Sequence, residues 1–161
     1  MSPKSQPAGK VGEIRCWAIC HSTEDEHKVE MALRNVVGSE AAIEHVRTET
    51  HFGQPMSIIS CRLSGGKKIS EILSRFSAED IETLLGQLEE RLDSDNTFHI
   101  RLDKQQTYEG EPKLSCSFDP VTRKKRDSID LDIHFTTYPS RRENAIRFIE
   151  SLLRKNDLEQ G

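Results

Sequence analysis

A strict alternation of apolar and polar residues near the C-terminal end constrains the fold of this chain more than any other feature. The apolar members are Ile129, Leu131, Ile133 and Phe135, and the polar ones are Asp130, Asp132, His134 and Thr136. Because successive side chains of a strand point to opposite faces, the pattern predicts a strand with one face in a core and one in water. Such strands are typical of antiparallel sheets.

Four amphipathic stretches predict helices. A capping box of Thr23 and Glu26 begins the first, which ends at Gly38, and a second of Ser140 and Glu143 begins the last. Between them, apolar residues at helical spacing predict a short helix over 69–76 and a longer one from Ser77, as its N-cap, to residue 92.

The remaining apolar runs predict strands over 13–21, 42–50, 56–63, 98–103 and 114–118, with 51–55 as the turn of a hairpin. The order of elements is then β-α-β-β-α-α-β-β-β-α. It predicts an α+β fold, in which one largely antiparallel sheet has helices packed on one face.

A length of 161 residues suits one hydrophobic core. We expect a disordered tail over 1–10, a single domain over 11–155 and a C-terminal tail over 156–161. No apolar run approaches the roughly 18 residues of a membrane span, and the first residues lack the apolar segment of a signal peptide. We therefore expect a cytoplasmic protein that does not enter a membrane. The four scattered cysteines fit reduced, buried thiols.

The formal net charge is −4, so the chain has no general field that attracts nucleic acid. Between residues 77 and 95 there are seven acidic residues and one basic residue. A polyanion site would therefore have to be a local basic patch.

Three groups of basic residues could form such a patch. The tract Arg123, Lys124, Lys125 and Arg126 can reach a phosphate backbone, although a solvated loop would have the same composition. Arg141 and Arg142 occupy the first turn of the last helix, where acidic residues are usual and where a bound phosphate would explain them. Their alternative role is to pair with nearby carboxylates. Arg101 and Lys104 lie along and after a strand, and a cross-strand pair of Arg101 with an aspartate is equally plausible.

Motifs for catalysis or cofactors are absent from the sequence. Asp130, Asp132 and His134 share a strand face and could approach one metal ion, but a solvated strand face has the same pattern. We therefore expect no enzyme activity, no metal and no cofactor.

Three segments together resemble a family of small archaeal proteins described as RNA-binding and as predicted exosome subunits. They are residues 22–29 (STEDEHKV), 98–105 (FHIRLDKQ) and 138–146 (YPSRRENAI), and the resemblance extends over about residues 12–154. It implies a fold like the double-stranded-RNA-binding domain, similar to the ribosomal proteins that bind the small ribosomal RNA. The basic positions of the family correspond to Arg101, Lys104, Arg141 and Arg142.

The resemblance implies a non-catalytic RNA-binding protein that assists RNA processing or degradation, with RNA and exosome proteins as partners. The alternative is a protein-interaction subunit or a homodimeric scaffold without nucleic acid, whose contact surface would be the acidic helix or a sheet edge.

Overall fold

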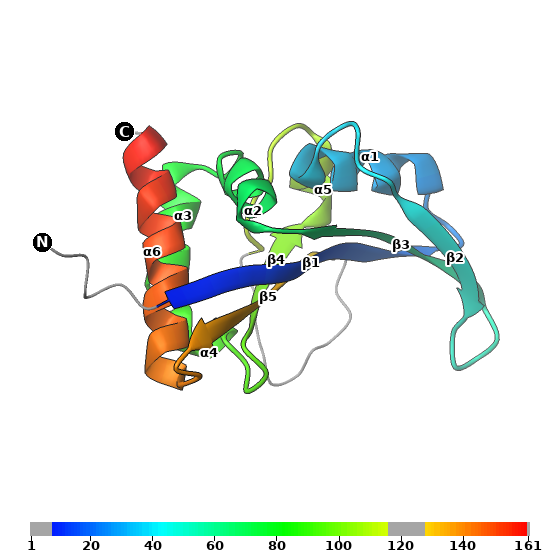
Figure 1. The fold of residues 1–161 in the computed structure, drawn as a ribbon. Coiled ribbons are helices and arrows are strands. Elements are labelled where there is room, and N and C mark those ends of the chain that lie inside the picture. Colours follow the sequence, from blue (N-terminus) through cyan, green and yellow to red (C-terminus); the bar gives the residue numbers. More distant parts are fainter. Residues whose placement is uncertain (1–7, 116–127, 161) are drawn as a thin grey trace, which may run out of the picture. The chain divides into compact units, whose positions relative to one another are not determined.

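The computed structural model of the chain describes the backbone of residues 8–115 and 128–160 and the side chains of residues 9–115 and 128–156. In this part of the chain it shows five strands and six helices, which confirms the α+β class (Figure 1). The strands are β1 (Ala8–His21), β2 (Glu44–Glu49), β3 (Pro55–Ser64), β4 (Thr97–Asp103) and β5 (Ser128–Tyr138). The helices are α1 (Glu26–Val37), α2 (Gly66–Leu73), α3 (Ala78–Leu85), α4 (Leu88–Arg91), α5 (Lys104–Tyr108) and α6 (Arg142–Gln160).

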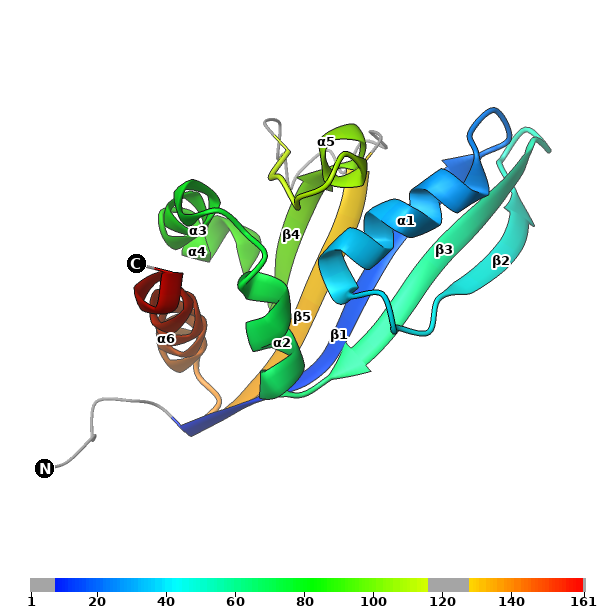
Figure 2. The same cartoon turned by 90° about the horizontal axis from the view of Figure 1, so that it is seen from above.

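The strands form one sheet in the order β2-β3-β1-β5-β4, and neighbouring strands run in opposite directions (Figure 2). The antiparallel sheet predicted from the sequence is therefore confirmed. Along β5 the residues from Ile129 to Phe135 alternate as expected, since each apolar side chain there is fully buried. Burial alternates in the same way along β4.

The described residues group into two compact units, and the strands contribute to both. One, which we call the α1 unit, contains the described parts of 15–62 and 100–131. The other, the α6 unit, contains the described parts of 1–14, 63–99 and 132–161. The single domain expected over 11–155 stays a prediction.

In the α1 unit, helix α1 lies along the strands and buries a stripe of five apolar residues: Val29, Ala32, Leu33, Val36 and Val37. The N-cap of α1 is Asp25, whose carboxylate accepts a hydrogen bond from the backbone N–H of His27 at 2.9 Å. The predicted cap, Thr23, is therefore wrong by two residues, because the turn after β1 continues to Asp25. Asn35 joins α1 to α5, donating to the carbonyl of Thr107 at 2.8 Å.

The hairpin of β2 and β3 belongs to the α1 unit and confirms the predicted hairpin. Its register pairs Glu44 with Ser60 and Glu49 with Pro55. Thr50 closes the tip, since its N–H donates to the carbonyl of Gln54 at 2.8 Å and its hydroxyl accepts from the Gln54 N–H at 3.0 Å. Gly53 has a φ of +78°, the left-handed conformation that favours glycine in such turns.

In the α6 unit, helices α2, α3 and α6 surround a core that includes Ile72, Leu84 and Ile149. The buried amide of Asn156 in α6 donates to the carbonyl of Leu73 in α2 at 2.7 Å. The rings of Phe135 and Phe148 pack with their centroids 5.4 Å apart.

Three sequence-based expectations about the elements differ from the structure. The long helix predicted over 77–92 begins with the expected N-cap, Ser77, but is divided into α3 and α4. The division falls at Gly86, which has poor helix propensity and whose N–H binds the carbonyls of Glu82 and Thr83. Helix α5 was not expected. Of the strand predicted over 114–118, Leu114 forms an isolated bridge with Leu102, and residues 116–118 lie outside the described residues.

Candidate nucleic-acid interface

Lys104 and Arg101, two of the predicted RNA-binding residues, lie in the α1 unit close to acidic partners. The Lys104 ammonium donates to the carbonyl of Ile19 at 2.8 Å and to both carboxylate oxygens of Glu24 at 3.1 and 3.2 Å, and its side chain is 10% exposed. The Arg101 Nε lies 3.5 Å from Oδ1 of Asp130, and these two side chains are 17% and 18% exposed. Both positive charges are thus neutralised and shielded within the unit.

Arg142 is the first residue of α6, and Arg141, which was predicted to lie in the first turn, directly precedes the helix. Their side chains have different surroundings. Arg142 donates to the carbonyls of Glu89 at 2.9 Å and Leu92 at 3.1 Å, so it satisfies carbonyl groups at the end of α4. The Arg141 side chain is exposed and, within the described residues, has no ion-pair or hydrogen-bond partner. Among the predicted RNA-binding residues that the structure describes, Arg141 is therefore the one best able to bind an anion.

The tract from Arg123 to Arg126, also predicted to contact RNA, lies outside the described residues. The structure therefore brings together Arg101 and Lys104 in one unit and Arg141 and Arg142 in the other.

The three residues considered for a metal site have separate partners. Asp130 lies beside Arg101, Asp132 accepts a hydrogen bond from Nδ1 of His99 at 2.8 Å, and Nδ1 of His134 lies 3.2 Å from the hydroxyl of Thr97. In the described part of the chain, no group of three or more acidic, histidine or cysteine residues is arranged to hold a metal ion. The alternation of β5 is explained by these cross-strand contacts.

Two histidines lie between pairs of carboxylates, which the sequence pattern did not reveal. His99 contacts Asp132 at 2.8 Å and Asp93 at 2.7 Å. The hydrogen bond from Asp132 raises the pKa of His99, burial opposes this shift, and Asp93 adds to it. His45 contacts Glu30 at 2.6 Å and Glu26 at 3.1 Å, and the hydrogen bond with Glu30 is the main reason that its pKa is also raised.

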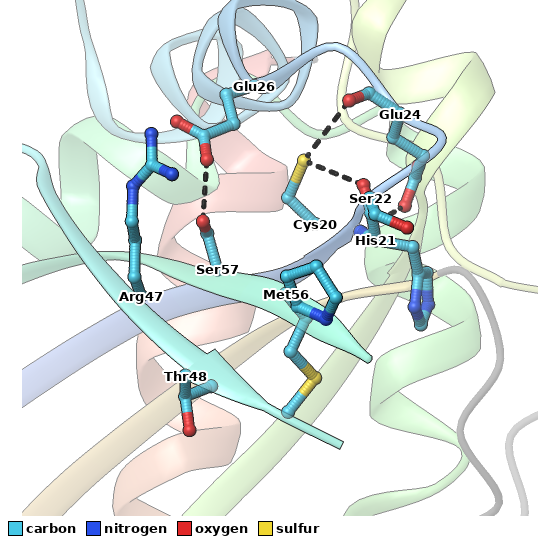
Figure 3. A pocket seen from close by; sticks show the side chains of 10 residues that line it. Cys20, His21, Ser22, Glu24, Glu26, Arg47, Thr48, Met56 and Ser57 are labelled. Carbon is cyan, nitrogen blue, oxygen red and sulfur yellow. Dashed lines mark hydrogen bonds between the residues drawn. The ribbon is translucent and has the colours of Figure 1, made fainter. Parts of the chain in front are cut away.

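A pocket of about 240 Å³ lies in the α1 unit, between the end of β1, the start of α1 and the β2–β3 hairpin (Figure 3). Its lining residues come from three stretches of sequence: Cys20, His21, Ser22, Glu24 and Glu26; Arg47 and Thr48; and Pro55, Met56 and Ser57. The segment 22–29 that carries the family resemblance contributes Ser22, Glu24 and Glu26 to this pocket. No motif indicated that the three stretches meet, because the hairpin register is needed to align them.

Glu26 is the acidic group of the pocket that is best placed for a ligand. Its Oε1 accepts a hydrogen bond from the Ser57 hydroxyl at 2.5 Å, and its side chain is 38% exposed. The guanidinium of Arg47 lies beside this carboxylate in Figure 3. Hydrogen bonds from Ser57 and His45 lower the pKa of Glu26, opposed by desolvation and assisted by the charge of Arg47. Glu26 is therefore an ionised acceptor next to a cationic donor.

The thiol of Cys20 forms the inner wall of the same pocket. Burial and, to a lesser degree, the nearby Glu24 raise its pKa, so the sulfur is an uncharged thiol. Its Sγ lies 3.7 and 3.8 Å from the carbonyl oxygens of His21 and Glu24. A thiol in this state is a weak donor and an apolar surface, and is poorly suited to nucleophilic chemistry.

The described residues thus form a small α+β protein with an exposed arginine at a helix start and a mixed polar pocket. The model of a family described as RNA binding matches residues 13–135, and the chain belongs to this family. Membership of an archaeal RNA-binding family, which the sequence led us to expect, is therefore confirmed.

Two relatives show how far this similarity extends. The chain is 30% identical over 161 residues to RNA-binding protein PAB1135 of Pyrococcus abyssi, covering 93% of this chain and 99% of that protein. It is 36% identical over 114 residues to the uncharacterized protein MJ0213 of Methanocaldococcus jannaschii, covering 65% of this chain and 76% of that protein.

Two solved structures are similar over most of their length. A DUF54 protein from Archaeglobus fulgidus has a TM-score of 0.75 and 33% identity, covering 89% of this chain and 99% of that one. A DUF54 protein from Methanothermobacter thermautotrophicus has a TM-score of 0.68 and 29% identity, covering 89% of this chain and 98% of that one. No helix in the described residues is both long and apolar enough to cross a membrane.

Proposed function

We propose that this protein binds RNA without catalysing a reaction and serves as an accessory factor in RNA processing or degradation in the cytoplasm, with exosome proteins among its partners. Membership of the RNA-binding family supports the first part of this proposal. The single structural observation that favours phosphate contact is the exposed Arg141, which lies where a helix presents unpaired N–H groups.

The phosphate contacts are best assigned to Arg141 and to the tract from Arg123 to Arg126. Arg101 and Lys104 would have to give up Asp130 and Glu24 before they could bind a phosphate. Arg142 would have to release two carbonyl groups. Because those exchanges cost about as much as a new phosphate contact stabilises, Arg101, Lys104 and Arg142 contribute less to RNA affinity than Arg141 does.

The salt dependence of RNA binding tests this assignment. With about four to six phosphates neutralised, log affinity should fall against log salt with a slope of about −3 to −5. Arg141→Glu should weaken binding and make the slope shallower by about one, while Arg101→Gln serves as the matched control and should leave the slope unchanged. Binding that is independent of salt, or an unchanged slope for Arg141→Glu, would contradict the assignment.

A protein-interaction role is the second candidate, and the edge strand β2 favours it. Val46 in this strand is 51% exposed and Phe52 at the hairpin tip is 89% exposed. An edge strand with exposed apolar side chains can pair with another chain. Light scattering over a range of protein concentrations measures whether a homodimer forms. A homodimer that fails to bind RNA would support the protein-interaction role over the RNA-binding role.

A further inference from the structure

The pocket between the β2–β3 hairpin and the start of α1 differs in chemistry from a phosphate site. Its charged groups are Glu24, Glu26 and Arg47, and the nearby Lys104 pairs with Glu24. The carboxylate of Glu26 would repel a phosphate at the position where Arg47 could attract it. The pocket therefore suits a neutral polar group that offers donors and an acceptor side by side.

Its size and remaining walls favour a flat ring. The volume of about 240 Å³ is below the roughly 300–1,000 Å³ of pockets for drug-sized ligands, so a single base fits better than a whole nucleotide. Pro55 and the thiol of Cys20 supply apolar surface for the face of a ring. The hydroxyl of Ser57 lies on the same face of the hairpin as Arg47, whereas Thr48 points to the opposite face (Figure 3).

Among the four RNA bases, guanine matches this arrangement of donors and acceptors. Its Watson–Crick edge carries two adjacent donors, N1–H and the N2 amino group, followed by the O6 acceptor. A carboxylate can accept both donors at once, and a neighbouring guanidinium can donate to O6. Adenine, cytosine and uracil each lack the pair of adjacent donors, so Glu26 would bind them through one hydrogen bond at most.

We propose that this pocket binds an unpaired guanine base of RNA, with Glu26 accepting hydrogen bonds from N1–H and N2–H and Arg47 donating to O6. The proposal rests on the RNA-binding function proposed above and gives it a base preference. Each oxygen of Glu26 keeps a lone pair for the base, because Ser57 and His45 each occupy only one position on it. The preference applies to unpaired bases, since this edge is hidden in a duplex.

The hairpin tip next to the pocket supplies a stacking surface for a neighbouring base. Phe52 lies in the turn between the two strand ends that line the pocket. Its ring packs edge to face against that of His51, with the ring centroids 5.5 Å apart. The turn is held by backbone bonds of Thr50 with Gly53 and Gln54, so a phenylalanine is not needed to form it. An aromatic ring that is 89% exposed on a fixed turn can stack on a base without rearrangement.

The test compares oligouridine 12-mers with a single central guanine, adenine, cytosine or uridine, using fluorescence anisotropy. We expect the guanine-containing strand to bind on the order of tenfold more tightly than the other three. Glu26→Gln and Arg47→Gln should each remove this difference between the guanine strand and the other three. Glu49→Gln and Arg62→Gln, exposed residues of the same hairpin that do not line the pocket, are the matched controls and should keep the difference.

Thermal unfolding of each variant shows whether the fold is intact, since Glu26 also contacts His45 and Ser57. Because Arg47 is exposed, Arg47→Gln keeps the test decisive even if Glu26→Gln destabilises the protein. Equal affinity for all four strands, or a guanine preference that survives Arg47→Gln, would overturn the pocket assignment alone. Failure to bind any of the strands or a structured RNA would instead overturn the proposed function.

Discussion

The Nδ1 atom of His99 lies 2.8 Å from Oδ1 of Asp132 on the adjacent strand, and this contact makes the stability of the protein depend on pH. Asp132 and then Asp93 raise the pKa of His99 against the effect of burial, and Glu30 and Glu26 do the same for His45. A raised pKa in the folded state means that the stabilisation is complete below the ordinary value of 6.5 and is lost as pH rises through the folded pKa.

We therefore predict that the free energy of unfolding decreases as the pH rises above about 6.5 through the raised pKa of the two histidines. Denaturant unfolding at a series of pH values measures this decrease. His99→Gln and His45→Gln should each remove part of the pH dependence, and the double variant should remove most of it. Stability that stays constant or increases over this window in the unmodified protein would show that the histidines are not paired in solution.

Acidification should lower stability for the opposite reason. Hydrogen bonds with Ser57 and His45 lower the pKa of Glu26, and those with His99 and two backbone N–H groups lower that of Asp93 despite its burial. A lowered folded pKa gives stability that is present above the ordinary values of 4.5 and 3.8 and is lost as pH falls below them. The unfolding curves should therefore show a maximum between about pH 4.5 and 6.5, and a loss that begins only far below pH 4 would contradict the assigned contacts.

Lys104 is expected to matter more for stability than for RNA affinity. Its side chain is 10% exposed and its ammonium binds Glu24 and the carbonyl of Ile19, so Lys104→Met leaves the partly buried Glu24 carboxylate without its cationic partner. We expect a loss of about 1.5–3 kcal/mol in the free energy of unfolding, the usual range for hydrogen bonds to charged groups. Arg141→Met is the control and should change stability by less than about 0.5 kcal/mol, because that side chain is exposed.

RNA affinity of the same two variants separates structural from binding roles. Lys104→Met should retain the salt dependence of the unmodified protein at a temperature where it is folded. A loss of salt dependence as large as that of Arg141→Met would show instead that Lys104 leaves Glu24 to contact phosphate.

The sequence was sufficient to predict a largely antiparallel sheet and the buried face of β5, because successive side chains of a strand alternate between its two faces. Ile129 to Phe135 alternate in the chain and in the structure. The hairpin turn predicted over 51–55 lies one residue earlier, at 50–54, because Pro55 pairs with Glu49 and begins β3. The division between α3 and α4 was missed because a hydrophobic stripe continues across Gly86, whereas helix continuity depends on the backbone. Partners such as Glu24 for Lys104, 80 residues apart, depend on how the strands align, which local patterns do not encode.

The buried face of β5 allows a direct test of the core. Leu131 and Ile133 are both 0% exposed, one in each compact unit. Leu131→Ala and Ile133→Ala should each lower the free energy of unfolding by about 2–5 kcal/mol, because truncation leaves a cavity and removes buried apolar surface. Thr136→Ala, an exposed position of the same strand, is the control. Losses below about 1 kcal/mol at both core positions would show that the other face of β5 is buried.

Phe52 provides the clearest separation of function from stability. Its side chain is 89% exposed and the turn is held by Thr50 and Gly53, so Phe52→Ala should change the free energy of unfolding by less than about 0.5 kcal/mol. Stacking on one base contributes about 1–3 kcal/mol, so the same variant should weaken binding to single-stranded RNA by about five- to a hundredfold. Phe52→Trp should retain or strengthen binding, because it keeps an aromatic face, whereas Phe52→Leu keeps only the apolar area. If the Phe52→Ala and Phe52→Leu variants bind RNA as tightly as the unmodified protein, the hairpin tip does not contact RNA bases. The exposed ring would then be better explained by the protein-interaction role of the adjoining edge strand β2.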